Sequence, residues 1–257
     1  MRERRRFDAV PRSPRLFETV EDRRPAFFTE AASLDAGAVY GERVVARGRA
    51  TLRRWEPSRS KLGAALAKGY TERLPRPDEG WLYLGAATGT TASHIADLVG
   101  DGGRLYALER SLRPFARLLR LVERYPNLLP IFGDARRPET YAGDVGPVDG
   151  LYADIAQPDQ VEILLANARV FLAPSASILL VLKTASMGRA AEPRDHLATA
   201  RRELEDAGVE VVSVLGLEPF HKRHYLVTGA PTRALFRPSA RPAPASSPRA
   251  RRAERPR

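Results

Sequence analysis

Short apolar runs of strand length alternate with amphipathic segments from about residue 60 onward. The apolar runs cover residues 81–84, 104–108, 128–132, 150–155, 178–182, 209–215 and 224–228. Helical segments lie between most of them, as in 161–172, where apolar residues recur every three or four positions and form one stripe. Near-continuous apolar strands that alternate with such helices indicate a parallel sheet with helices on both faces.

The last two runs, 209–215 and 224–228, are separated only by the eight residues GLEPFHKR. A parallel connection requires a longer crossover, so we expect these two strands to run antiparallel. The sequence therefore predicts a doubly wound, Rossmann-like α/β fold, with a seven-stranded, mostly parallel sheet and one reversed strand near an edge. We assign this domain to residues 57–236, with a helix over 60–70 that Ser60 caps.

Residues 16–56 have a different pattern. The runs 16–20, 26–30 and 38–45 contain aromatic and β-branched residues between polar turns, which favours strands over helices. This segment is too short to build a strong core of its own. We predict a small β-rich N-terminal domain that packs on the α/β domain.

The net charge of +11 is concentrated at the two ends of the chain. Residues 1–15 contain six Arg and two acids, and residues 237–257 contain seven Arg and one acid, whereas residues 16–236 contain 29 basic and 28 acidic groups. We therefore expect a basic N-terminal extension over 1–15 and a disordered Arg/Pro-rich tail over 237–257. A basic protein of this kind is typical of nucleic-acid binding, but any such surface on the body must be local.

The composition also excludes several classes of protein. The chain has no cysteine and only four histidines, which excludes disulfide scaffolds and thiolate zinc sites and leads us to expect no metal site. No apolar run approaches the roughly 20 residues of a membrane span, and the N-terminus lacks the apolar stretch of a signal peptide. We expect a protein with no membrane association and a cytoplasmic location.

Candidate chemistry follows the strands, because ligands in open α/β sheets bind beyond the carboxyl ends of the strands. After the first strand, GAATGTT supplies Gly85 and Gly89 for a tight turn, and Thr90 and Thr91 for the start of a helix. Glu109 follows the second strand, 20 residues after Gly89, where an acid can accept ribose hydroxyls. The glycine spacing does not complete the dinucleotide fingerprint, so a turn without a ligand stays an alternative.

Polar residues also follow the later strands. Asp134 comes after the third strand, where a carboxylate can accept an adenine amino group, and Asp154 and Lys183 come after the fourth and fifth. Asp154 and Lys183 are expected on neighbouring strand ends, close enough to pair. A lysine at the end of a central strand is costly unless it is paired, which favours function over an ordinary ion pair.

Several motifs resemble the fibrillarin family, specifically its archaeal members. They are LRRWEPSRSKLGAAL, LYLGAATGTTASHIADLVG, DGLYADIAQPDQ and LVLKTAS, together with NLLPIFGDARRPETY for a third strand and AFFTEAASLDAGAVYGERVV for a small N-terminal β domain. The resemblance extends from about residue 16 to residue 230. It implies a class I S-adenosylmethionine-dependent methyltransferase fold.

The resemblance also implies an activity and partners. The activity is 2'-O-methylation of ribose in rRNA and tRNA, with S-adenosyl-L-methionine as cofactor and a box C/D guide RNA that selects the target. The implied partners in the ribonucleoprotein are a Nop-domain scaffold protein and a kink-turn-binding protein.

The site residues follow from the same motifs. Together with Gly85, the residues implied to line the cofactor site are Thr90, Thr91, Glu109, Arg110, Asp134, Ala135, Asp154, Ile155, Ala156 and Gln157. The family's Lys-Asp-Lys-His catalytic set falls on Lys61, Asp154, Lys183 and His224. We assign Lys183 to stabilising the developing oxyanion, Asp154 to holding Lys183 and orienting the hydroxyl, and Lys61 and His224 to the neighbouring phosphate or ribose.

Two alternatives stay open at this point. A nicotinamide-dependent oxidoreductase also fits a glycine loop followed by Glu109, although the third glycine is absent. A non-catalytic methyltransferase-fold scaffold within a ribonucleoprotein is the second. Among the other histidines, we expect His94 to serve packing, and His196 and His221 to lie on the surface without further role.

Overall fold

The computed structural model describes residues 6–33, 35, 37–188 and 192–237. Its larger part is a seven-stranded sheet in the order β11-β12-β10-β9-β6-β7-β8. The strands are β6 (Gly80–Leu84), β7 (Arg104–Glu109), β8 (Leu128–Phe132), β9 (Val148–Ala153), β10 (Leu172–Lys183), β11 (Val209–Gly216) and β12 (His224–Pro231). β12 runs antiparallel to both of its neighbours, β10 and β11, and the other pairs of neighbouring strands in this sheet are parallel. The predicted fold class is therefore confirmed, including the reversed strand next to the edge.

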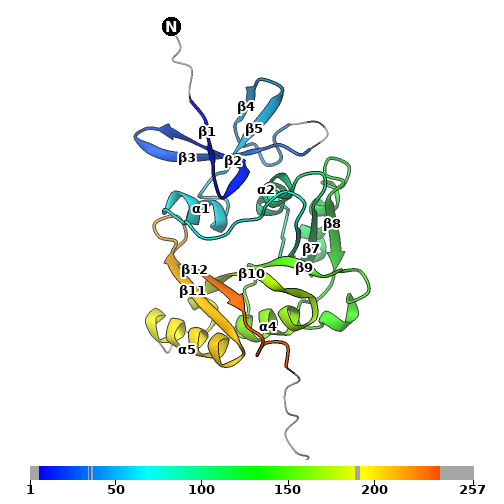
Figure 1. Ribbon diagram of the computed structural model, residues 1–257, viewed down its shortest axis with the longest axis vertical. Helices are drawn as coiled ribbons and strands as arrows, with labels where there is room; N and C mark the ends of the chain where they lie inside the picture. Colours follow the sequence, from blue (N-terminus) through cyan, green and yellow to red (C-terminus); the bar gives the residue numbers. More distant parts are fainter. Residues whose placement is uncertain (1–5, 34, 36, 189–191, 238–257) are drawn as a thin grey trace, which may run out of the picture.

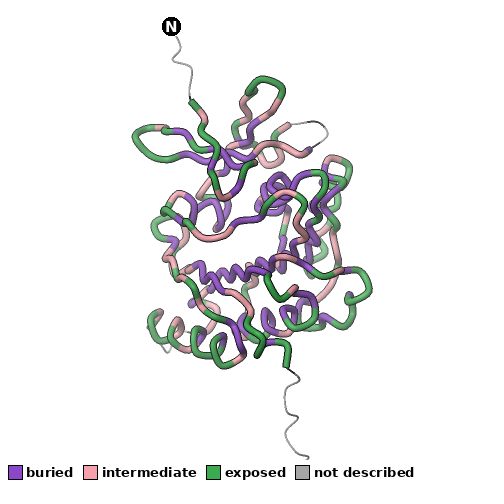
Figure 2. Tube along the Cα trace, viewed as in Figure 1, coloured by how far each residue is buried: buried purple, intermediate pink, exposed green. Residues whose placement is uncertain are grey.

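Helices cover both faces of this sheet (Figure 1). They are α1 (Lys61–Ala67), α2 (Thr90–Val99) and α3 (Leu112–Leu119) on one face, and α4 (Gln160–Phe171) and α5 (Pro193–Asp206) on the other, with short 3-10 turns η1 (Pro138–Thr140) and η2 (Thr184–Ser186). Successive side chains of a strand point to opposite faces of the sheet and so belong to two separate hydrophobic cores. In β6, Trp81 and Tyr83 pack on the side of α1 and α2, and Leu82 and Leu84 pack on the side of α4. Figure 2 shows buried chain along the central strands.

The N-terminal part is a five-stranded antiparallel sheet in the order β1-β2-β3-β5-β4. Its strands are β1 (Asp8–Val10), β2 (Ser13–Glu21), β3 (Arg24–Glu30), β4 (Val44–Arg47) and β5 (Ala50–Arg54). The sheet lies against α1 and α2 (Figure 1), so it packs on the larger domain as predicted. No helix in the described part of the chain is long and apolar enough to cross a membrane.

Three details of the N-terminal prediction were wrong. The sheet begins at Asp8, inside the expected basic extension, and Val10 is buried there. The predicted strand over 38–45 forms only from Val44 onward, as β4. The carboxylate of Glu42 accepts hydrogen bonds from the backbone N–H groups of Val39 and Tyr40 and holds the preceding segment as a loop. Strand β5 was not predicted. Most of the tail predicted over residues 237–257 lies outside the described residues.

Candidate active site

The carboxyl ends of β6, β7, β9 and β10 meet where the chain switches from one side of β6 to the other. Gly85 follows β6 directly and has a φ of +84°, and a Cβ there would lie 2.8 Å from the carbonyl oxygen of Asp154. A side chain at Gly85 would thus force the two loops apart. The glycine turn brings the start of α2 next to the end of β9.

Asp154 lies between the two predicted lysines. Its Oδ1 is 2.6 Å from Nζ of Lys183, and its Oδ2 is 2.9 Å from Nζ of Lys61. Nζ of Lys183 also donates a hydrogen bond of 3.0 Å to the carbonyl oxygen of Asp154. The side chains are 6% exposed for Asp154, 12% for Lys183 and 26% for Lys61. The cluster therefore places one net positive charge in a partly desolvated position that solvent still reaches.

The WEPSRSKLG segment fixes the position of Lys61, the first residue of α1. The hydroxyl of Ser60 caps this helix by accepting a hydrogen bond of 3.2 Å from the N–H of Gly63. Thr91, on α2, donates its hydroxyl proton to the same Ser60 oxygen at 2.9 Å. Gly63 has no room for a side chain, because a Cβ there would lie 2.7 Å from the Trp55 ring. The starts of α1 and α2 are thus held together.

Two histidines lie on the other side of Lys183. His224 is the β12 residue opposite Lys183 in the antiparallel ladder. Its Nδ1 lies 2.7 Å from the carbonyl oxygen of Lys222, so Nδ1 is the donor of this hydrogen bond. The ring of His221 lies 6.0 Å from that of His224, and its Nε2 is 2.9 Å from the carbonyl oxygen of Pro57. Burial, helped by Lys61, lowers the pKa of His221.

The sequence predicted only a surface position for His221, because no local pattern places residue 221 near Lys61. Its partner Pro57 is 164 positions away in the chain. His196 is half-buried and makes a contact of 3.3 Å with the carbonyl oxygen of Gly188.

A small, partly open pocket of about 50 Å³ adjoins this cluster through Gly85 and Ile155. It is lined by Gly85, Leu108, Glu109, Arg110, Gly133, Asp134, Ala135, Arg136, Ile155, Gln157 and Ile163. Most of these were named from the motifs, and Leu108, Gly133, Arg136 and Ile163 were not. Apolar walls with a few carboxylates suit a flat, partly polar ligand such as a nucleoside.

Glu109 is the last residue of β7 and is 8% exposed. Its two oxygens accept hydrogen bonds from the N–H groups of Ala87, at 2.9 Å, and Ser111, at 2.7 Å. Each carboxylate oxygen has two lone pairs, so the fixed carboxylate keeps acceptor capacity for hydroxyls in the pocket. Asp134 is more exposed, accepts a hydrogen bond from the N–H of Arg136, and has Arg110 3.5 Å away.

Arg136 links the two loops that border the pocket. Its guanidinium donates to both carboxylate oxygens of Asp159, at 2.8 and 2.6 Å, and to Oε1 of Gln157, at 2.8 Å. These hydrogen bonds hold the pKa of Asp159 below its usual value. No sequence pattern indicates this link, because the partners lie more than 20 positions apart in loops.

The comparison with known proteins identifies the family of this site. A family model described as Fibrillarin matches residues 11–233. The chain belongs to the fibrillarin family. A curated relative, the fibrillarin-like rRNA/tRNA 2'-O-methyltransferase of Aeropyrum pernix, is 42% identical over 189 residues, which cover 74% of this chain and 81% of the relative. The protein of that name from Staphylothermus marinus is 43% identical over the same shares of the two chains.

Solved fibrillarin structures have the same fold. The Methanococcus jannaschii fibrillarin pre-rRNA processing protein has a TM-score of 0.84 at 34% identity, covering 89% of this chain and 98% of that chain. Aeropyrum pernix fibrillarin in complex with natively bound S-adenosyl-L-methionine has a TM-score of 0.79 at 37% identity, and the match covers 88% of this chain and 98% of that chain. A structure of a fibrillarin/Nop5p complex has a TM-score of 0.73 at 40% identity, and the match covers 80% of this chain and 94% of that chain.

Some residues that the resemblance implied for the cofactor site lie outside the lining of this pocket. Thr90 is the half-buried first residue of α2, Thr91 is buried with its hydroxyl turned to Ser60, and Ala156 is exposed. Their roles toward a cofactor stay predictions. Within the described ranges there is no group of three or more His, Asp or Glu side chains that could hold a metal ion.

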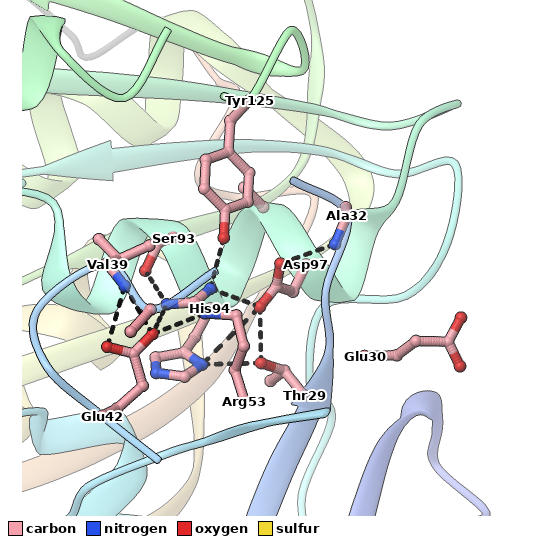
Figure 3. A network of polar contacts seen from close by, with 12 residues as sticks. Thr29, Glu30, Ala32, Val39, Glu42, Arg53, Ser93, His94, Asp97 and Tyr125 are labelled. Carbon is pink, nitrogen blue, oxygen red and sulfur yellow. Dashed lines mark hydrogen bonds and ion pairs between the residues drawn. The ribbon is translucent and has the colours of Figure 1, made fainter. Parts of the chain in front are cut away.

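A second charged cluster, which the sequence did not predict, joins the N-terminal sheet to α2 (Figure 3). Arg53 is fully buried, and its guanidinium contacts the carboxylates of Glu42, at 2.6 Å, and Asp97, at 2.7 Å. It also donates to the hydroxyls of Ser93 and Tyr125. Figure 3 shows these groups converging on the guanidinium from α2, the loop before β4 and the segment before β8.

His94 belongs to the same cluster. Its Nδ1 is 2.8 Å from the hydroxyl of Thr29, its Nε2 is 2.7 Å from that of Tyr40, and its ring stacks on Trp55. Burial and the nearby Arg53 lower the pKa of His94 well below 6.5, so the ring is neutral. Its expected packing role is confirmed by its complete burial.

Proposed function

We propose that this protein transfers the methyl group of S-adenosyl-L-methionine to the 2'-hydroxyl of ribose in rRNA and tRNA, as the catalytic subunit of a guide-RNA-directed ribonucleoprotein. The observation that carries the proposal is the Lys61–Asp154–Lys183 cluster beside a pocket that Glu109 and Asp134 line. Membership of the fibrillarin family supports it, as does the structure of the Aeropyrum pernix relative with natively bound S-adenosyl-L-methionine.

The residues around the pocket fit this cofactor. Glu109 has free lone pairs for the ribose hydroxyls, and Asp134 can accept from the adenine amino group. Gly85 keeps the β6 and β9 loops close, so the pocket continues directly into the lysine cluster. When bound, S-adenosyl-L-methionine supplies an electrophilic methyl group on a sulfonium. Glu109 and Asp134 would hold the nucleoside part of the cofactor, next to the loop that carries Asp154.

The lysine cluster supplies the electrostatics of the reaction. A ribose hydroxyl is a weak acid, and its oxygen would gain negative charge as its proton passes to a base, here the carboxylate of Asp154, while the new O–C bond forms and the sulfonium S–C bond breaks. A cation placed at that oxygen stabilises the transition state more than the ground state, and Lys183 has this role in our proposal. Asp154 holds Lys183 and Lys61 at 2.6 and 2.9 Å and orients the hydroxyl. Lys61 and His224 bind the neighbouring phosphate or position the ribose.

The distribution of charge explains why partners are needed. Tracking RNA phosphates requires several net cations, and residues 16–236 contain 29 basic and 28 acidic groups. We propose that a Nop-domain scaffold protein, the box C/D guide RNA and a kink-turn-binding protein supply the missing affinity and the target selection. The fibrillarin/Nop5p complex, whose fibrillarin is 40% identical to this chain, supports the first of these partners.

Two measurements test the proposal and separate it from its alternatives. Calorimetry should show binding of S-adenosyl-L-methionine in preference to NAD, and micromolar NAD binding without S-adenosyl-L-methionine binding would indicate an oxidoreductase instead. Methyl transfer to a target RNA should then require guide RNA and scaffold. Cofactor binding without turnover in the complete particle would indicate a non-catalytic scaffold.

A further inference from the structure

The strand that ends in Lys183 loses one of its neighbours before it ends. In the parallel ladder, the last residue of β9, Ala153, lies opposite Leu180. The chain then turns away, and β10 continues for three more residues to Lys183. On its other side Lys183 still faces β12, where His224 is its partner. Where β9 has left the sheet, the backbone of Lys183 requires another source of hydrogen bonds.

Gln160 provides these hydrogen bonds. Its Oε1 accepts from the backbone N–H of Lys183 at 2.9 Å, and its Nε2 donates to the carbonyl oxygen of Lys183 at 3.2 Å. Gln160 is the first residue of α4, and it is fully buried. A side-chain amide has the donor and the acceptor of a peptide group, so Gln160 replaces the missing strand residue opposite Lys183.

This contact also determines how Lys183 faces β12. Because its N–H and C=O point toward Gln160, Lys183 and His224 form a non-hydrogen-bonded antiparallel pair, in which the side chains come closest. Gln160 thus holds the backbone from which the Lys183 side chain starts, 2.6 Å from Asp154 at its other end.

We propose that Gln160 is a positioning residue for methyl transfer: its amide holds the backbone of Lys183 so that the ammonium group stays aligned with Asp154 and the reacting ribose oxygen. The inference rests on the proposed function, since it gives Lys183 a substrate to act on. A neutral amide is required here. A carboxylate would still accept from the N–H of Lys183 but would place its other oxygen, an acceptor, against the carbonyl oxygen of Lys183, and an apolar side chain would leave both backbone groups without a partner.

The test compares Gln160→Met with the wild type in a particle assembled with guide RNA, scaffold and kink-turn-binding protein. Methionine keeps the length of the side chain and removes both hydrogen bonds. A misplacement of about 1 Å can reduce a rate about 100-fold, so kcat should fall by about 10- to 100-fold. The KM for RNA and the affinity for S-adenosyl-L-methionine, measured by calorimetry, should be unchanged.

Asn127→Leu is the matched control. Asn127 is another buried amide, and it donates to the carbonyl oxygens of Ala96 and Gly100 at the end of α2, away from the lysine cluster. Its replacement should lower the melting temperature and leave kcat unchanged when both variants are assayed well below their melting temperatures. If Gln160 has only a structural role, Gln160→Met will behave in the same way.

Gln160→Glu gives a second readout that a structural role would not produce. A protonated carboxyl group has one donor and one acceptor, like the amide, whereas a carboxylate has only acceptors. The kcat of Gln160→Glu relative to Gln160→Met should therefore rise as the pH falls. Both variants share Lys61, Asp154, Lys183, His221 and His224, so the ratio removes the titrations of these groups.

The outcomes separate the inference from the proposed function. An active wild type with an equally active Gln160→Met would overturn the inference alone. A ratio of the Glu to the Met variant that does not change with pH would overturn the role of the amide pair. A wild type that binds S-adenosyl-L-methionine but transfers no methyl group in the complete particle would overturn both the proposed function and this inference.

Discussion

The molecule contains two clusters of charged residues with opposite designs. Around Arg53 one cation is shared by two carboxylates, and the side chains of all three are fully buried. Around Asp154 one carboxylate is shared by two lysines, and these side chains keep between 6% and 26% exposure. The first cluster has a net charge of −1 and joins two sheets. The second has a net charge of +1 and lies beside a pocket.

The difference shows how a charged cluster that only stabilises the fold can be told from one that can bind a substrate. Each nitrogen of the Arg53 guanidinium has a partner within the protein, so the guanidinium has no nitrogen left to bind a ligand. Asp154 neutralises only one of the two lysine charges, and the remaining ammonium charge is close to solvent, where it can bind an oxygen of the substrate. Charge alone would not distinguish the two clusters. Burial and the number of satisfied hydrogen-bonding groups do.

Replacing Arg53 should have the largest effect on stability. Arg53→Leu leaves the carboxylates of Glu42 and Asp97 buried without a counter-ion, which should reduce the free energy of unfolding by about 3–5 kcal/mol. Urea denaturation measures this loss, and Arg53→Lys, which keeps the charge, should lose less. A loss below about 1 kcal/mol for Arg53→Leu would contradict the structural role of the cluster.

Replacing Lys183 should affect activity instead. Lys183→Ala removes the proposed oxyanion contact, and the loss of one such contact reduces the rate by about 10²–10³-fold. The affinity for S-adenosyl-L-methionine should change little, because Lys183 is not in the pocket lining. Methyl transfer in the assembled particle and calorimetry measure the two effects.

The matched variant Asp154→Ala should be as severe as Lys183→Ala, and the double variant scarcely worse than either single one, because the two residues act as a unit. Near-normal turnover of Lys183→Ala would contradict the assignment and make Lys61 the next candidate.

A smaller effect is expected at the turn that connects the pocket to the lysine cluster. Gly85→Ala places a Cβ 2.8 Å from the carbonyl oxygen of Asp154 and imposes a positive φ on alanine. Strain of this kind costs about 1–3 kcal/mol. Cofactor affinity and the melting temperature should both fall. Gly143→Ala, with open space around it, is the control and should change neither.

The sequence predicted the site best where chemistry follows a strand directly. Asp154 and Lys183 could be paired because parallel strands end at one edge of the sheet, which is a property of the local pattern and the fold class. Gln160 could not be recognised, because a polar residue at a helix start resembles a solvated one. Its role depends on where β9 ends relative to β10.

The same limitation explains the misjudged N-terminal region. Arg53 lies between Leu52 and Arg54 in β5, and a basic side chain in a strand normally indicates a solvent-facing position. Its complete burial depends on Glu42 and Asp97, which are 11 and 44 positions away. Partners at such distances in the sequence have no periodicity that a single chain can reveal.

The smallest effect expected is a dependence of stability on pH that arises from His94. Its pKa in the folded protein is well below 6.5, because burial and Arg53 disfavour the charged ring. The unfolded chain therefore binds a proton that the folded chain does not, and stability falls as the pH falls below about 6.5. For this residue alone the loss is about 1.4 kcal/mol at pH 5.5.

Urea denaturation at pH 7.5 and 5.5 measures this dependence, with His94→Gln as the comparison. The pKa of His221 is also lowered, so the wild type keeps some dependence of the same sign from that residue. His94→Gln should be less stable at pH 7.5, because it loses the stacking on Trp55, but its stability should change less between the two pH values. An equal change in both proteins would show that the pKa of His94 is not lowered by folding.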